Sequence, residues 1–204
     1  MKSASGVLMI LCGPSGVGKT SIAQALLERH EALSMSISYT TRDRRGEEMD
    51  GVDYHFVSGQ RFEEMRRREA FAEWAEVHGN HYGTSVQVIE DAWQEGRDLL
   101  FDIDYQGAEQ LKGRYLDATA VLIAPPDMEE LERRLRGRNT DSEEVIQGRL
   151  EVARHELSQY ESFDYVMAND QLEEAIDVAS AIYRAARHEL RLQRPWIRDL
   201  LGSH

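Results

Sequence analysis

An uninterrupted run near the start of the chain has residues whose types and spacing could do chemistry, namely Gly13-Pro14-Ser15-Gly16-Val17-Gly18-Lys19-Thr20. The run fits the pattern G-x-x-x-x-G-K-[ST], in which backbone N–H groups turn inward around an anion and the next helix adds partial positive charge. In such a loop Lys19 would reach the β- and γ-phosphates, and the Thr20 hydroxyl would hold Mg²⁺. The run therefore predicts a site for a nucleoside triphosphate rather than a chance glycine turn.

A second group of phosphate-binding residue types lies between residues 36 and 57. Arg42, Arg44 and Arg45 stand close together there, and Tyr54 follows them. Guanidinium groups bind phosphate oxygens in a bidentate way, and a tyrosine hydroxyl can add another donor. The segment could hold a phosphate other than the one in the glycine loop, or, taken alone, it could be a charged surface hairpin.

Two carboxylates lie at the end of a later apolar run. Asp102 ends that run in the position of a Walker-B acid, where it would order Mg²⁺ through water. The alternative is an aspartate that caps the next helix. Asp104, two residues on, would point to the same side of a strand, so both carboxylates could face one cleft.

The elements that must position these residues alternate between strands and helices. A strand over 6–12 leads into the glycine run, and a helix over 19–31 follows it. Further strands are predicted at 34–38, 98–103, 118–124 and 164–167. Further helices are predicted at 106–114, 127–136 and 172–192, and one more helix, after the second of these, is predicted to end near Tyr160. This alternation predicts an α/β fold with a parallel sheet flanked by helices, formed by residues 1–38 and 94–204.

Residues 39–93 interrupt the alternation and form a predicted inserted lobe that is rich in β-structure. Its strands are expected around 53–57, 72–77 and 81–84, and its helices near 59–69 and 85–94. Within the core, a polar stretch over 138–144 separates two predicted helices, and the family resemblance given below implies a short helical lid over about 136–150. The tail 194–204 could be an amphipathic contact or a loose end.

Composition narrows the class of protein. The chain has 204 residues, 41% of them hydrophobic, which suits one compact soluble domain. A net charge of −13 argues against DNA or RNA as a partner, and no apolar run is long enough to span a membrane. Cys12 is the single cysteine, so no intrachain disulfide can form, and a cytoplasmic location is expected.

Motifs that lie far apart in the chain give it a family resemblance. They are Ser36-x-Ser38-x-Thr40-Thr41-Arg42, Asp53-Tyr54-x-Phe56, Phe71-Ala72-Glu73-Trp74-Ala75, Gly79-Asn80-His81-Tyr82-Gly83-Thr84, Asp102-Ile103-Asp104-Tyr105-Gln106-Gly107, Ile123-Ala124-Pro125-Pro126, Arg134-Leu135-Arg136-Gly137-Arg138 and Asn169-Asp170. Together with the glycine loop, they make residues 5 to about 190 resemble guanylate kinase, one of the nucleoside monophosphate kinases. The resemblance implies a P-loop kinase fold with a GMP-binding lobe and a lid.

The resemblance also implies a GMP site. Ser38, Glu73 and Asp104 would read the guanine base with help from Thr84, and Arg42, Arg45, Tyr54 and Tyr82 would hold the phosphate, with Gly83 in the same loop. The chain departs from the family pattern at the second arginine that would hold the GMP phosphate. Gly46 follows Arg45 directly and Glu47 takes the usual glycine place, so Arg44 stays open as a substitute for Arg45.

For ATP, the resemblance implies binding by the glycine run Gly13–Thr20 and, on the adenine side, by Asn169 and Asp170. Thr20 and Asp102 would hold Mg²⁺, which is the expected cofactor. The implied catalytic residues are cationic side chains that neutralise charge as the phosphoryl group moves, namely Lys19, Arg42, Arg134, Arg138 and Arg149. For the last three, a solvated helix face is the competing interpretation.

These expectations predict the reaction ATP + GMP ⇌ ADP + GDP. One alternative is a related kinase with another small phosphorylated acceptor, which would lack the set of base-reading residues. Another is a non-catalytic guanylate-kinase-like module that binds protein partners, although such modules typically lose the loop lysine or the arginines. A P-loop GTPase is disfavoured because the chain has no Asp-x-x-Gly switch followed by Asn-Lys-x-Asp.

Overall fold

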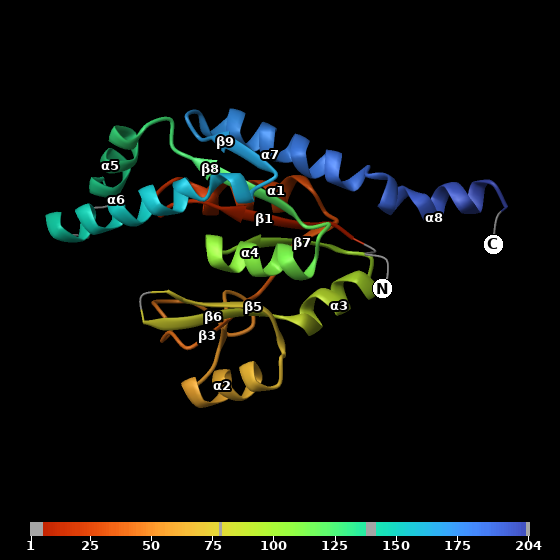
Figure 1. Cartoon of the computed structure of the whole chain (residues 1–204), viewed down its shortest axis with the longest axis horizontal. Coiled ribbons are helices and arrows are strands. Elements are labelled where there is room, and N and C mark those ends of the chain that lie inside the picture. The colour runs from red at the N-terminus through yellow and green to blue at the C-terminus, as the bar shows by residue number, and fades with distance from the viewer. Residues whose placement is uncertain (1–5, 78, 138–141, 203–204) are drawn as a thin grey trace.

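The computed structural model describes residues 6–77, 79–137 and 142–202. Its main sheet has five parallel strands whose spatial order is β2 (Leu33–Met35), β7 (Asp98–Asp102), β1 (Leu8–Cys12), β8 (Thr119–Ala124) and β9 (Tyr165–Ala168). Figure 1 shows helices on both faces of this sheet. The predicted fold class, an α/β protein with a parallel core, is confirmed.

The central strand β1 explains the two layers of the core. All five of its residues are buried, and successive side chains point to opposite faces. Met9 and Leu11 pack with α1 (Lys19–Arg29) and α7 (Leu172–Arg187). Leu8 and Ile10 pack with α3 (Val86–Gln94) and α4 (Tyr105–Arg114). A continuously apolar strand is therefore what a sheet covered on both faces requires.

Two helices between β8 and β9 form a smaller unit beside the sheet. They are α5 (Met128–Arg136) and α6 (Glu143–Ser158), followed by a short 3₁₀ turn over Tyr160–Ser162. Leu131 and Leu135 of α5 pack against Ile146 and Leu150 of α6. Asp127 caps α5 by accepting from the backbone N–H of Glu130 at 2.7 Å, as its place in the sequence suggests.

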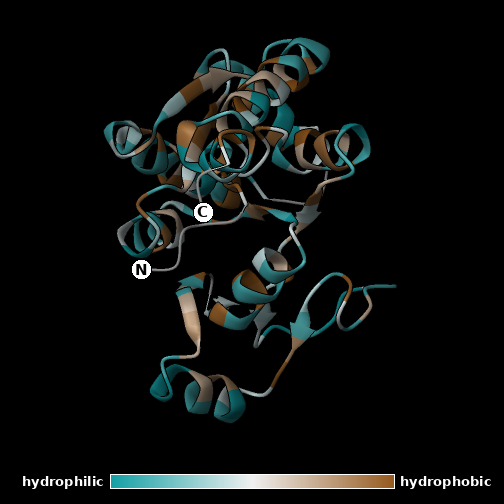
Figure 2. Ribbon diagram, turned by 90° about the vertical axis from the view of Figure 1, so that its right-hand side faces the viewer, coloured by the Kyte–Doolittle hydropathy of each residue, from teal (hydrophilic) through white to brown (hydrophobic). Residues whose placement is uncertain are grey.

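The β-rich lobe is built on a second sheet, with strand order β4 (His55–Phe56), β3 (Tyr39–Thr40), β6 (Asn80–Ser85) and β5 (Phe71–Val77). Helix α2 (Gly59–Arg67) closes its small core, where the Phe62 and Phe71 rings stack with centroids 4.5 Å apart. Figure 2 shows this lobe below the main body. The boundaries of the lobe stay a prediction.

The C-terminal part of the chain differs from its prediction. The sequence predicts one helix over 172–192, but the chain breaks at Glu189, whose φ of −60° and ψ of 143° are extended. A second helix, α8 (Leu190–Leu200), follows and contains Pro195. It has no buried residue and projects from the body (Figure 1). Among the described residues, no helix is long and apolar enough to cross a bilayer.

Candidate active site

The candidate site lies at the carboxyl edge of the main sheet. Strand β1 pairs with β7 on one side and with β8 on the other, and Leu11 is in register with Asp102. The chain leaves β1 into the glycine loop and leaves β7 at Asp102, so both segments meet at one edge. Parallel α/β sheets bind ligands outside this edge, where neighbouring connections diverge.

Lys19, the first residue of α1, contacts the beginning of the glycine loop. The Nζ of Lys19 donates to the carbonyl of Gly13 at 2.5 Å and lies 4.0 Å from Oδ1 of Asp102. Gly18 precedes α1 with a φ of 100°, and a Cβ there would lie 2.3 Å from Nδ2 of Asn169. Only glycine fits that position, because it needs both left-handed backbone and the space beside Asn169.

Asn169 and Arg134 hold this loop in place through a chain of hydrogen bonds. The buried Asn169 side chain donates to the carbonyl of Val17 at 2.7 Å, and Arg134 donates to the carbonyl of Asn169 at 2.9 Å. Glu130 fixes the other side of the Arg134 guanidinium at 2.6 Å. Asp170, next to Asn169, is exposed. The contacts of Asn169, Asp170 and Arg134 with ATP stay predictions.

The residues expected to hold Mg²⁺ carry oxygen atoms, which is the kind of ligand that this ion prefers. Asp102 ends β7 beside Lys19, with 30% of its side chain exposed, and Thr20 is exposed at the start of α1. Burial raises the pKa of Asp102, and the charge of Lys19 opposes that rise. The described residues contain no cluster of three or more acidic, histidine or cysteine ligands. The carboxylate of Asp102 and the hydroxyl of Thr20 are oxygen ligands of the kind that Mg²⁺ takes, beside waters and substrate phosphates.

The lobe brings together three of the residues predicted to bind the acceptor phosphate. The Arg42 guanidinium lies 5.2 Å from the centre of the Tyr54 ring, and the Tyr54 and Tyr82 rings are 5.9 Å apart. Sequence reasoning did not single out Glu48, which accepts from both terminal nitrogens of Arg42 at 2.8 and 3.0 Å. This bidentate pair raises the pKa of Arg42 above its ordinary value.

The predicted base-reading residues Ser38, Glu73 and Thr84 lie on or beside neighbouring strands of the lobe sheet. Glu73 of β5 lies directly across from Thr84 of β6, and Oγ of Ser38 is 3.5 Å from Oγ1 of Thr84. The Glu73 side chain is 4% exposed. Burial raises its pKa to about 7, the Thr84 hydrogen bond opposes that rise, and the charge of Asp104 adds to it. A desolvated carboxylate beside two hydroxyls can pair with a planar donor edge.

Helix α4 contributes the remaining member of this set. The sequence predicts Asp104 on a strand beside Asp102, and this placement is wrong. Strand β7 ends at Asp102, and Asp104 is the N-cap residue of α4, accepting from the backbone N–H of Gly107 at 2.9 Å. A Cβ on Gly107 would lie 2.7 Å from Oε2 of Glu73. The lack of a side chain at this helix position therefore lets α4 approach Glu73 closely.

Comparison with known proteins decides the family. The sequence model of the guanylate kinase family matches residues 5–185. The guanylate kinase of Rhizobium etli is 46% identical over 96% of this chain and 91% of its own length, and that of Chromobacterium violaceum is 50% identical over 92% and 89%. The crystal structure of guanylate kinase from Anaplasma phagocytophilum superposes with a TM-score of 0.78 at 32% identity, covering 100% of this chain and 99% of that one.

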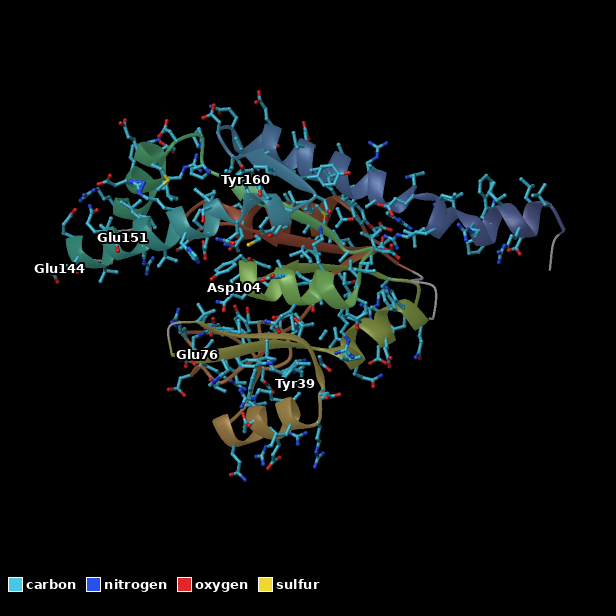
Figure 3. All side chains as sticks on the ribbon, viewed as in Figure 1. Tyr39, Glu76, Asp104, Glu144, Glu151 and Tyr160 are labelled. Carbon is cyan, nitrogen blue, oxygen red and sulfur yellow. The ribbon has the colours of Figure 1, made fainter. Side chains whose placement is uncertain are left out.

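This chain belongs to the guanylate kinase family. Its resemblance to that family in sequence is thus confirmed. The roles of the individual residues stay predictions, and the structure gives a place to all of them except Arg138, which lies outside the described residues. Figure 3 shows Asp104 between α6 and the lobe sheet, which puts the base-reading end of the site next to the helices that follow β8.

The departure of this chain from the guanylate kinase pattern at the second arginine can be described in contacts. The Arg44 guanidinium lies 5.2 Å from the centre of the Phe56 ring. The backbone N–H of Arg45 donates to Glu48 at 2.8 Å, while its side chain is exposed. The choice of Arg45 for the GMP phosphate stays a prediction.

The lid arginines of the guanylate kinase pattern occupy different surroundings. Arg134 braces the glycine loop, as described above, and Arg149 is half-buried on α6. Arg138 lies outside the described residues. Sequence reasoning overlooked Glu156 on α6, whose Oε2 is buried. Its helical position alone carries no signal of a functional role, because charged residues are frequent throughout α6.

Proposed function

We propose that this protein transfers the γ-phosphoryl group of ATP to GMP, giving ADP and GDP. As a member of the guanylate kinase family, it is a phosphotransferase. The observation that carries the choice of acceptor is the buried carboxylate of Glu73, held against Thr84 and next to Asp104. It lies in the same lobe as the Arg42–Tyr54–Tyr82 group, which is suited to a phosphate.

Base selection follows from donor and acceptor patterns. Guanine presents donors at N1 and N2 and an acceptor at O6. The ionised Glu73 carboxylate can accept from both donors, and a hydroxyl of Ser38 or Thr84 can donate to O6. Adenine lacks the paired donors, so AMP would leave the buried carboxylate unpaired, at a cost of about 1–3 kcal/mol or more.

The chemistry needs no covalent intermediate with the protein. An oxygen of the GMP phosphate is already nucleophilic, so the side chains have to align it with the γ-phosphoryl group and balance the negative charge. Lys19 would contact the β- and γ-phosphates from the glycine loop, and Arg134, Arg138 and Arg149 would neutralise charge from the lid side. Mg²⁺, held through Thr20 and Asp102, would supply further charge neutralisation.

The acceptor phosphate must either share the Arg42 guanidinium with Glu48 or displace Glu48 from it. Both terminal nitrogens of Arg42 are engaged by Glu48. We infer that the GMP phosphate binds on the side of Arg42 that faces Tyr54 and Tyr82, and that Glu48 keeps the guanidinium oriented before the phosphate arrives. Closure of the lobe and lid would exclude water and suppress ATP hydrolysis.

Product analysis tests the proposal directly. The purified protein is mixed with ATP labelled in its γ-phosphate, Mg²⁺ and GMP, and the nucleotides are separated. Label appearing in GDP supports the kinase. Label in inorganic phosphate alone would indicate hydrolysis, and no loss of ATP from a folded protein that binds GMP would indicate the non-catalytic module.

The natural partners in this proposal are the nucleotides ATP, ADP, GMP and GDP. The net charge of −13 supports small anionic substrates bound at local clusters of arginine rather than nucleic acid. We propose a cytoplasmic location, where these nucleotides occur and where the buried thiol of Cys12 suits a reducing compartment. Separation of cell extracts into cytosolic and membrane fractions tests the location.

A further inference from the structure

The acidic residue Glu156 of α6 has a feature that the proposed reaction leaves unexplained. Its Oε2 atom is buried and has no hydrogen-bond partner among the described residues. The charged groups that act on it are Lys19 of the glycine loop and Asp104 at the start of α4. A buried carboxylate oxygen without a donor is costly, so its presence calls for a partner that arrives with a ligand.

The position of Glu156 is set by packing on both sides. Ala153, one turn earlier, belongs to the apolar cluster that joins α6 to α5. His155, the preceding residue, is 3.2 Å from the hydroxyl of Tyr105 on α4, and the two rings meet edge to face at 5.4 Å. Helix α6 is thus held against the start of α4, and Figure 3 shows Asp104 beneath it.

The two charged neighbours of Glu156 mark the two ends of the proposed acceptor. Lys19 belongs to the loop that would hold the phosphates of ATP, next to which the GMP phosphate must lie. Asp104 belongs to the set that would read the base. Because the charges of both groups act on Glu156, we infer that its buried oxygen faces the part of GMP that joins the phosphate to the base, which is the ribose. This placement rests on the proposed function.

The chemistry of GMP offers one kind of donor in that stretch. An ionised carboxylate only accepts hydrogen bonds, and the phosphate groups are mostly ionised at pH 7, so they repel it rather than donate to it. The ribose carries hydroxyls, each of which can donate. Burial raises the pKa of Glu156 to about 7, the charge of Lys19 opposes that rise, and the charge of Asp104 adds to it.

We propose that the carboxylate of Glu156 accepts a hydrogen bond from a ribose hydroxyl of bound GMP. Helix α6 then contributes to the acceptor site, although the base and phosphate contacts come from the lobe and from α4. The contact couples sugar recognition to the helix that also carries Arg149, a predicted lid arginine.

The test removes each partner of the proposed bond in turn. The kcat/KM of the wild type, Glu156→Gln and Glu156→Ala is measured with GMP and with 2′,3′-dideoxy-GMP. A hydrogen bond between a hydroxyl and a charged group predicts that the wild type prefers GMP by about ten- to a hundredfold. In Glu156→Ala this preference falls to near unity, because the effects of removing the two partners are not additive. Glu156→Gln, which keeps an acceptor oxygen, falls between them.

Controls separate this contact from other effects. Glu151→Gln removes an exposed charge from the same helix and should leave both kcat/KM values within about twofold of the wild type. The KM for ATP and the melting temperature show whether a variant is damaged elsewhere. The 2′-deoxy and 3′-deoxy analogues then assign the hydroxyl.

Three results would overturn the inference. A wild type that uses GMP and the dideoxy analogue equally well has no such bond. Variants of Glu156 that lose the same factor with both acceptors would place Glu156 beside Lys19 or the ATP phosphates instead. A wild type that phosphorylates no GMP at all would remove the proposed function, and this inference with it, so the wild-type GMP measurement distinguishes the two failures.

Discussion

Glu73 is the side chain on which base selection depends. It is buried between Thr84 across the lobe sheet and Gly107 on α4. Among the described residues, few positions combine a carboxylate with such burial, and a buried charge persists only where partners or function require it. Its neighbours are the hydrogen-bonding Thr84 and a second carboxylate, Asp104, so guanine would add a pair of N–H donors to the bond that Thr84 gives.

Substitution of Glu73 by Gln tests the base contact. The amide keeps the shape but replaces an acceptor with an N–H₂ group that opposes the guanine donors. The kcat/KM for GMP should fall about a hundredfold or more, while the KM for ATP stays within about twofold. Steady-state kinetics with each substrate varied in turn measures both values. Glu76→Gln on the same strand, where the side chain is exposed, is the matched control. Unchanged kinetics with GMP would contradict the assignment.

The pH dependence of GMP binding follows from the raised pKa of Glu73. Because burial moves this pKa from 4.5 to about 7, the carboxyl is mostly neutral below pH 7 in the free protein. Two donors on guanine favour the ionised form, so binding releases a proton. The affinity for GMP should rise about tenfold between pH 6 and pH 7.5 and then level off.

The same titration with Glu73→Gln isolates this residue. The second ionisation of a phosphate monoester, near pH 6, affects both proteins alike. Calorimetry in buffers of different ionisation enthalpy counts the protons released. An equal pH dependence in the two proteins would exclude Glu73 as its source.

The loop between β1 and α1 depends on braces from distant elements. Asn169, just after β9, binds the carbonyl of Val17, and Arg134 of α5 binds the carbonyl of Asn169. The amino-acid pattern of the loop predicts its ligand, but it does not predict the hydrogen bonds from Asn169 and Arg134, which lie more than a hundred residues away in sequence. Their geometry emerges only when β8 pairs with β1 and β9 pairs with β8 in the sheet.

Replacing Asn169 with Ala tests the brace. The change leaves the Val17 carbonyl without its buried donor, at a cost of about 1–3 kcal/mol, and it loosens the glycine loop. We expect a higher KM for ATP, a lower melting temperature and a nearly unchanged KM for GMP. Gln171→Ala, at an exposed neighbouring position, should behave as the wild type. A rise in the KM for GMP alone would show that Asn169 acts on the acceptor side.

Most elements of the core could be predicted because their patterns are long and periodic. The strand and helix around the glycine run are clear examples, since an apolar strand and an amphipathic helix flank a known loop pattern. Two features could not be predicted. β3 has two residues, too few for any period, and the break at Glu189 depends on one extended residue within a helical pattern.

Within the site, residue identities could be inferred but contacts could not. Arg42 was identifiable from its motif, whereas its bidentate partner Glu48 depends on how residues 43–47 turn back. Asp104 was identifiable as well, yet its place at the start of α4 rather than on a strand follows from where β7 ends. Such details require the three-dimensional packing of segments that are distant in sequence.

On the scale of the whole molecule, one buried aspartate joins both ends of the chain. Asp98, at the start of β7, accepts from the backbone N–H of Val7 at 2.8 Å and from the hydroxyl of Tyr183 at 2.6 Å. Arg187 of α7 completes the cluster, 3.1 Å away. The cluster around Asp98 lies at the opposite end of β7 from Asp102, so it serves stability rather than chemistry.

Tyr183→Phe should therefore lower stability and leave activity intact. Loss of a buried hydrogen bond to a charged group costs about 1.5–3 kcal/mol. For a domain of this size, the melting temperature should fall by about 3 to 10 °C, with kcat within about twofold of the wild type. Tyr160→Phe, where the hydroxyl is exposed, is the control. An unchanged melting temperature measured by circular dichroism would show that Asp98 is satisfied without Tyr183.

The central claim, that the chain phosphorylates GMP and selects guanine, is tested most directly by an acceptor panel. ADP release is followed in a coupled assay with ATP and Mg²⁺, offering GMP, dGMP, AMP, UMP and CMP in parallel with a blank that lacks acceptor. We predict turnover confined to GMP and dGMP, with kcat/KM for GMP exceeding that for AMP by about a thousandfold or more. Comparable rates with AMP, or no turnover with GMP from a folded protein, would contradict the account.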